Sequence, residues 1–178
     1  CRMSDIKNYH SEEHSLSNGQ VLMRNYSFDE ALVIVREMTD NLVLDLFEKG
    51  LVTSSLTLWI AYDHRYEHEA SKGTVKLERG SNSSKKIIDA VEDLYFRIAD
   101  RYTGIRRIEV CANRVAPESY VQYSLFDDPK QTDKERHLQE AVLNVKQRYG
   151  KNAIMRGSNL LECSTYRERN EQIGGHRA

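Results

Sequence analysis

The sequence predicts an α+β domain whose elements follow the order β-α-β-β-α-β, and two kinds of pattern support this. Residues 54–63 alternate between apolar and polar side chains, as a strand with one buried face does. Two longer segments carry an apolar residue every three or four positions, which is typical of helices that bury one side. Because helices and strands alike have one apolar face, we expect a four-stranded sheet with both helices on one face and the other face open.

The first strand and the first helix come early in the chain. Residues 15–26 are predicted to form the strand, with Gly19 as a candidate bulge. Ser27 and Glu30 match a capping box, in which each side chain accepts a hydrogen bond from the other residue's backbone N–H. The helix then carries an apolar stripe at Phe28, Leu32, Val35, Met38, Leu42 and Leu46. Gly50 is its predicted stop.

A predicted β-hairpin follows. Its first strand is residues 54–63, its loop is the charged, histidine-rich segment 63–71, and its second strand is residues 74–79. Trp59 falls on the polar side of the first strand. It would either stack on a bound ligand or on this chain's own tail, or cover an edge of the sheet.

The second helix and the fourth strand complete the domain. Serine and asparagine residues at 81–84 form a cap, and the helical stripe comprises Ile88, Val91, Leu94 or Tyr95, Ile98 and Tyr102. Gly104 is the predicted helix stop. Residues 105–115 alternate again as a strand, and Pro117 closes the domain.

Composition and charge exclude several classes of protein. The formal net charge of −1 argues against a uniformly basic nucleic-acid binder, although residues 72–86 hold five basic side chains against one acidic. Residues 130–178 hold ten basic against six acidic. The three cysteines have no paired spacing, which argues against a disulfide framework or a zinc site and fits a reducing cytoplasm. No apolar run approaches the ~18 residues of a membrane span.

Other chemistry-bearing residues give weaker signals. His64 and His68 have a metal-like spacing only on a helix, and here they fall in a loop. Nothing in the sequence near Cys111 marks it as a nucleophile. The strands also lack the interleaved aromatic residues that stack bases in RNA-recognition modules.

A short apolar peptide follows the domain. Leu125 and Phe126 stand together before Asp127, Asp128 and Pro129. This pattern favours an exposed peptide whose apolar pair fills a pocket on another protein. Burying the pair gains roughly 1.5–3 kcal/mol per side chain, whereas ordering the backbone costs about 1–2 kcal/mol per residue. The peptide alone therefore binds weakly and needs a second contact by the same chain. The alternative is an edge strand or loop plug buried in this chain.

The remaining segment is predicted to be helical and then irregular. Thr132 and Glu135 match a second capping box, and residues 133–149 carry a thin apolar stripe, so this helix either docks on another surface or is marginal alone. Residues 151–178 lack a core pattern. They either fold back on the domain or bind a partner.

Several of these segments together resemble the C-terminal part of a bacterial Y-family (UmuC-like, ImpB/MucB/SamB type) translesion DNA polymerase. The pentapeptide Gln122-Tyr123-Ser124-Leu125-Phe126 is similar to the motif by which bacterial DNA polymerases and repair factors bind the sliding clamp. The last twelve residues, 167–178, also match, as do residues 15–22, 49–53 and 149–154. The resemblance covers nearly the whole chain.

This resemblance implies a division of the chain. Residues 1–13 would be a linker from a polymerase core, 14–118 the little finger domain, 119–129 the clamp-binding peptide, and 130–178 a C-terminal helix and basic tail. The chain would then be a piece of a longer protein without the palm, fingers and thumb.

The resemblance also implies two partners. The little finger lays its open sheet face on primer-template DNA and contacts phosphates independently of base sequence; the candidate residues are Ser15, Ser17, Arg24, Lys72, Thr74, Lys76, Arg79 and Arg107. In the clamp-binding peptide, Gln122 would hydrogen-bond at the pocket rim while Leu125 and Phe126 enter the pocket, with Ser124 completing the motif.

The expected chemistry follows from what the match omits. We expect no catalytic residue and no cofactor in this chain. The parent protein would be a DNA-directed DNA polymerase that uses Mg²⁺ and acts in DNA repair and the SOS response. It would be cytoplasmic and associated with the nucleoid, without a membrane partner. The alternative function is a stand-alone ferredoxin-like interaction or regulatory module, in which residues 121–128 pack against its own sheet.

Overall fold

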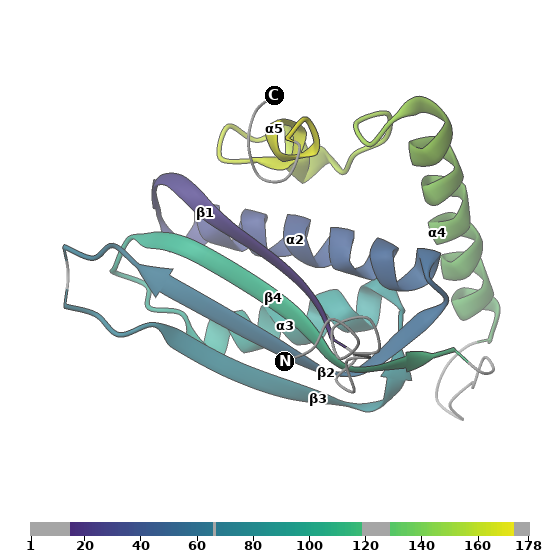
Figure 1. Ribbon diagram of the computed structural model, residues 1–178, viewed down its shortest axis with the longest axis horizontal. Coiled ribbons are helices and arrows are strands. Elements are labelled where there is room, and N and C mark those ends of the chain that lie inside the picture. The colour runs from purple at the N-terminus through teal and green to yellow at the C-terminus, as the bar shows by residue number, and fades with distance from the viewer. Residues whose placement is uncertain (1–14, 66, 119–128, 173–178) are drawn as a thin grey trace, which may run out of the picture.

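The computed structural model describes residues 15–65, 67–118 and 129–172. Their elements, labelled in Figure 1, are β1 (Leu16–Tyr26), α2 (Phe28–Glu48), β2 (Leu51–Tyr62), β3 (Ser71–Ser81), α3 (Ser84–Ile98), β4 (Ile105–Pro117), α4 (Pro129–Tyr149), the 3-10 helix η1 (Gly157–Leu160) and α5 (Tyr166–Asn170). No helix in these ranges combines the length and the apolar content needed to cross a bilayer.

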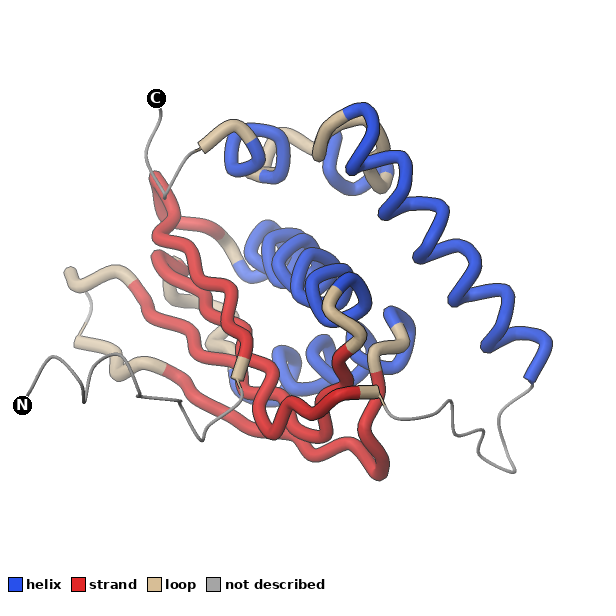
Figure 2. The backbone as a smooth tube through the Cα atoms, turned by 45° about the vertical axis from the view of Figure 1, so that its right-hand side comes forward, coloured by secondary structure: helices blue, strands red, loops and turns tan. Residues whose placement is uncertain are grey.

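The four strands form one antiparallel sheet in the order β1-β4-β2-β3. Both α2 and α3 lie on the same face of this sheet, as Figure 2 shows, and the apolar core lies between the two layers. Every second residue of the central strands enters that core, including Leu56, Leu58 and Ile60 on β2. The predicted fold class, with two helices on one face and the other face open, is confirmed.

The start of α2 also follows the prediction. Glu30 donates its backbone N–H to Ser27 Oγ at 3.4 Å, and Ser27 donates its own N–H to Glu30 Oε2 at 3.0 Å. The capping box therefore satisfies two backbone donors that have no partner within the helix. After the end of the helix, Gly50 adopts a φ of 61°, which costs glycine no steric strain.

The helix α3 is fixed against α2 and the sheet by close packing and by polar anchors. Tyr95 donates its hydroxyl to the Phe28 carbonyl at 2.8 Å inside the core, and burial raises the pKa of this phenol. Where α3 crosses β3, the place of a Cβ on Gly73 would lie 2.7 Å from Leu94 Cδ1. Only glycine allows the helix to approach the strand this closely without displacing a core side chain.

Two local predictions are wrong. The helix α3 ends at Ile98 rather than at Gly104, and Tyr102 is 96% exposed instead of completing the apolar stripe. Asp100 donates its backbone N–H to the Tyr62 hydroxyl at 2.8 Å, so a contact with β2 replaces the helical bond. Gly19 pairs in register with Glu109, and the irregularity of β1 falls later, between Val21 and Tyr26.

The helix α4 begins before the predicted capping box. It starts at Pro129, so Thr132 lies inside the helix and does not cap it. The Glu135 carboxylate instead accepts hydrogen bonds from Lys85 N at 2.9 Å and Ser83 Oγ at 2.9 and 3.0 Å. Ser83 is the N-cap of α3, so a side chain of α4 completes the cap of a different helix.

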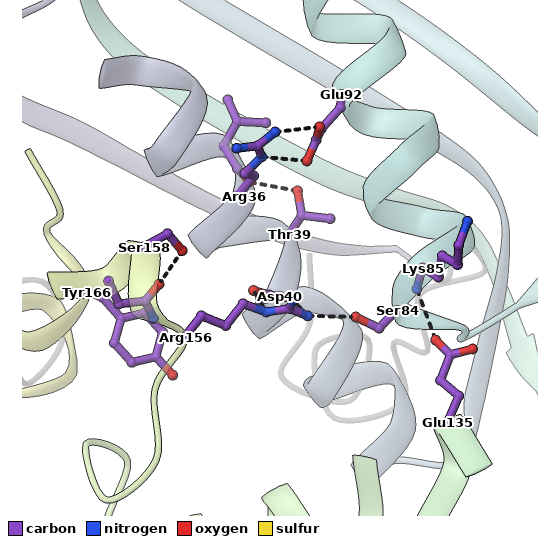
Figure 3. A network of polar contacts seen from close by, with 12 residues as sticks. Arg36, Thr39, Asp40, Ser84, Lys85, Glu92, Glu135, Arg156, Ser158 and Tyr166 are labelled. Carbon is purple, nitrogen blue, oxygen red and sulfur yellow. Dashed lines mark hydrogen bonds and ion pairs between the residues drawn. The ribbon is translucent and has the colours of Figure 1, made fainter. Parts of the chain in front are cut away.

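Residues 150–172 fold back over the outer side of α2, which settles the open question about this part of the tail. Figures 1 and 2 show this third layer, made of α4 and the segment containing η1 and α5. Polar contacts join it to α2: Arg156 pairs with Asp40 at 2.6 Å (Figure 3), and Thr165 donates its N–H to Glu37 at 3.3 Å. Burial raises the pKa of both carboxyls.

Candidate nucleic-acid interface

The open face of the sheet carries the opposite parity of each strand from the core. Strand register aligns its residues in rows that cross the sheet. One row is Ser17, Cys111, Thr57 and Thr74; the next is Gly19, Glu109, Trp59 and Lys72; flanking rows contain Val21, Arg107 and Ala61, and Asn113, Ser55 and Lys76. None of the described helices covers this face (Figure 2).

Five of the eight predicted phosphate-contacting residues meet on this face: Ser17, Lys72, Thr74, Lys76 and Arg107. All five are exposed. They come from three strands, β1, β3 and β4, and the pairing of those strands with each other and with β2 brings them together. The result is a surface of hydroxyl and cationic groups, which are the usual phosphate-contacting side chains of proteins.

The other three predicted residues lie apart from these rows. Ser15 is exposed immediately before β1, and Arg79 is exposed within the irregular stretch of the β2–β3 register between Lys76 and Ser81. Arg24 is committed to an intramolecular pair, with its Nη atoms 2.6 and 3.0 Å from the two carboxylate oxygens of Glu30. The hydrogen bond from Arg24 lowers the pKa of Glu30 to about 2.

A chain of side-chain hydrogen bonds crosses the middle of the open face. Asn113 donates to Thr57 Oγ1 at 2.8 Å, and Thr57 and Thr74 share a hydrogen bond of 2.9 Å. The Cys111 thiol donates to Asn113 Oδ1 at 3.2 Å. Burial raises the pKa of this thiol, so it remains a protonated member of the polar chain.

Trp59 also lies on the open face, but not at an edge. Its strand, β2, is flanked by β4 and β3, so the prediction that Trp59 covers a sheet edge is wrong. The Arg107 guanidinium carbon lies 5.0 Å from the centroid of the indole ring. Glu109 Oε2 lies 3.5 Å from Arg107 Nη2, so one acidic side chain stands among the cations.

The predicted phosphate contacts did not include Thr57, Asn113 and Glu109, although the alternation of their strands places all three on this face. Thr57 and Asn113 are neutral and Glu109 is acidic, so charge gave no signal for them. Strand parity was the signal that could have found them.

The histidine-rich loop has partners within the domain. His68 Nε2 lies 3.2 Å from Asp100 Oδ2, and the ring centroids of His68 and Tyr62 are 4.3 Å apart. His64 lies against Asp63 instead. In the described ranges, no group of three or more His, Cys, Asp or Glu side chains is arranged to hold a metal ion.

The predicted clamp-binding residues Gln122, Ser124, Leu125 and Phe126 lie outside the described residues. The flanks are described. Glu118 accepts hydrogen bonds from Asn82 at 3.2 Å and Arg136 at 2.6 Å, and α4 begins at Pro129.

Comparison with known proteins identifies the family. Residues 13–125 match the model of the impB/mucB/samB family C-terminal domain. The chain is 24% identical over 166 residues to DNA polymerase IV 2 of Bacillus subtilis (strain 168), covering 92% of this chain and 39% of that protein. It is 21% identical over 168 residues to DNA polymerase IV 2 of Halalkalibacterium halodurans, covering 94% and 40%. The chain thus spans about two fifths of the length of these relatives.

Solved structures give weaker likenesses. One is a complex of a beta-clamp processivity factor with the little finger domain of PolIV, at a TM-score of 0.45 and 11% identity, covering 64% of this chain and 100% of that chain. Another is an insertion ternary complex of Dbh DNA polymerase, at a TM-score of 0.44 and 16% identity, covering 62% and 33%. On the family match over 13–125, the chain belongs to the impB/mucB/samB family of Y-family DNA polymerases and carries the family's C-terminal domain.

Proposed function

We propose that this chain grips primer-template DNA through phosphate contacts on its open sheet face and tethers a translesion polymerase to the sliding clamp. The observation that supports the first part most directly is the uncovered face on which Lys72, Lys76 and Arg107 converge from two strands. The clamp tether is inferred from the pentapeptide that begins at Gln122.

The open face fits a sequence-independent grip. Its cations neutralise phosphates and release counterions, while Ser17 and Thr74 offer hydroxyl donors to phosphate oxygens. The described residues of this face form a sheet surface without a helix that could enter a groove and read base edges. This suits a polymerase that accepts damaged templates in any sequence.

The chain's overall charge limits the strength of the grip. Three phosphate contacts by Lys72, Lys76 and Arg107 predict a slope of about −2.7 in log K against log salt. Affinity then falls about 40-fold between 50 and 200 mM salt. Glu109 opposes part of this attraction, so binding by this chain alone is weak, and a clamp contact raises the effective concentration of the polymerase at the primer end.

A salt titration tests the DNA grip. The affinity of the full chain for fluorescein-labelled primer-template is measured by anisotropy from 25 to 200 mM salt. The double variant Lys72→Gln/Lys76→Gln is expected to lower the salt slope by about two, because two phosphate contacts are lost. The matched control is Lys49→Gln/Arg97→Gln, which removes the same charge from the helical layer.

The control should keep the wild-type slope. Equal losses in the two double variants would mean that net charge alone governs binding. Wild-type binding that is absent at low salt, or insensitive to salt, would contradict the proposed grip.

A pull-down tests the tether independently of DNA. Leu125→Ala/Phe126→Ala is expected to abolish capture by an immobilised bacterial sliding clamp, because the apolar pair supplies most of the peptide's burial. Tyr123→Ala changes the position that the Gln-x-Ser-Leu-Phe pattern leaves free and should be captured like wild type. Undiminished capture of the Leu125/Phe126 double variant would remove the peptide assignment.

A further inference from the structure

We propose that Trp59 positions Arg107 for DNA binding. Its indole holds the Arg107 guanidinium on the open face, so that the edge of the guanidinium meets a backbone phosphate of the DNA. This inference rests on the proposed DNA grip and names a residue outside the predicted set of phosphate contacts. Trp59 itself need not touch a base.

The position of Trp59 calls for an explanation other than core packing. It is absent from the buried core, and it lies on a central strand between β4 and β3. Its two partners in register, Glu109 and Lys72, are both charged, so no apolar residue directly opposite accounts for the ring. Here the ring is half-buried, and the Arg107 guanidinium carbon lies 5.0 Å from its centroid.

The sheet register creates room for this stack. Arg107 is paired with Ala61 on β2, and Trp59 with Glu109 on β4, so Trp59 and Arg107 are diagonal neighbours. Ala61 is too small to separate the two side chains. On the other side, Gly19 stands opposite Glu109, where an added Cβ would already be in contact with Glu109 Cγ at 3.5 Å. On β1, the partner of Glu109 thus has no side chain, whereas the partner of Arg107 is the exposed Val21.

The stack leaves the useful part of Arg107 available. A guanidinium has five N–H donors at its edge, and a cation–π contact uses its flat face or its charge rather than all of those donors. Glu109 Oε2 at 3.5 Å from Nη2 constrains one edge. The remaining edge is free to form a bidentate contact with a phosphate. Because Arg loses much rotamer freedom when it binds, holding it in advance lowers the entropic cost of that contact.

A double-mutant cycle tests this coupling in the full chain. Arg107→Gln is expected to weaken primer-template binding about 5-fold and to lower the salt slope by about one. Trp59→Leu should lower affinity by about 3-fold although it removes no charge, because it releases Arg107. The double variant should bind no more weakly than Arg107→Gln alone.

Conservative variants and a control separate positioning from structural damage. Trp59→Phe keeps an aromatic face and should recover most of the affinity lost in Trp59→Leu. Arg107→Lys keeps the charge but not the planar group, and should weaken binding only when Trp59 is present. Tyr102→Leu removes an exposed aromatic ring from the connection between α3 and β4, outside the open-face rows, and should leave affinity unchanged.

A second measurement needs no DNA. Trp59 is the one tryptophan of the chain, so its emission reports on the stack. Arg107→Gln should shift that emission to longer wavelength and increase its quenching by acrylamide in the free protein. Unchanged emission and quenching would overturn the stack even if Trp59→Leu failed to fold.

The outcomes distinguish this inference from the proposed function. Wild-type protein that fails to bind DNA overturns both. Two other results overturn only the role of Trp59. In the first, Lys72→Gln/Lys76→Gln weakens DNA binding but Trp59→Leu does not. In the second, the losses of affinity in Trp59→Leu and Arg107→Gln multiply in the double variant.

Discussion

At the scale of single residues, strand parity and local partners decide which cations are available for a ligand. Lys72 and Lys76 point from β3 onto the open face and are exposed. Arg24 is also basic, but it forms an ion pair with Glu30 at the start of α2. The sequence identified all three as candidates because it records charge and alternation, whereas the pairing of Arg24 depends on how β1 meets α2.

Glu135 shows the same dependence on partners, because it caps α3 from another helix. Replacing it with alanine removes the acceptor of Lys85 N and of the Ser83 hydroxyl. The loss of a cap acceptor costs about 0.5–2 kcal/mol, so Glu135→Ala should lower the unfolding free energy by about 1 kcal/mol. The measurement is a urea denaturation curve followed by circular dichroism.

The control for that experiment is Glu140→Ala, an exposed glutamate of the same helix. It should change the midpoint little, because alanine has a helix propensity as good as glutamate. A loss as large as that of Glu135→Ala would mean that weakening of α4 itself, rather than loss of the cap, lowers stability.

At the scale of elements, the sequence predicted which helices and strands form and in what order, but it misplaced several of their ends. Alternation and the Ser27–Glu30 box are local signals, and the elements that depend on them formed as expected. The end of α3 depends on the Tyr62 hydroxyl, which takes the Asp100 N–H from a distant strand. The start of α4 was misplaced because Thr132 and Glu135 match a capping box in the sequence, whereas the helix begins at Pro129 and Glu135 bonds to α3.

The local sequence pattern did not predict how the third layer packs, again because its contacts join residues that are distant in the sequence. Residues 150–172 dock through scattered polar groups, such as Arg156 on Asp40 and Thr165 on Glu37, instead of an apolar stripe. Burial lowers the pKa of Arg169, and Glu37 and Asp45 interact with it electrostatically in the opposite direction. Sequence periodicity carries no record of such long-range pairs.

At the scale of the whole molecule, the three layers leave one face of the sheet uncovered by any described element. The outer side of α2 is covered by α4 and the segment that follows it, and the inner sides of α2 and α3 are buried on the sheet. The sheet's other face is covered by no described element, and it collects Ser17, Lys72, Thr74, Lys76 and Arg107. Duplex DNA bound there would leave the third layer free for other contacts.

The most direct test of this arrangement is a residue-level map of the bound surface. Backbone amide signals of the full chain would be recorded by NMR during titration with primer-template DNA at low salt. The account predicts the largest shifts on the open-face rows, at residues 57–61, 72–76 and 107–113, with α4 and residues 150–172 nearly unchanged. Shifts confined to α4 and residues 150–172, with the sheet silent, would contradict it.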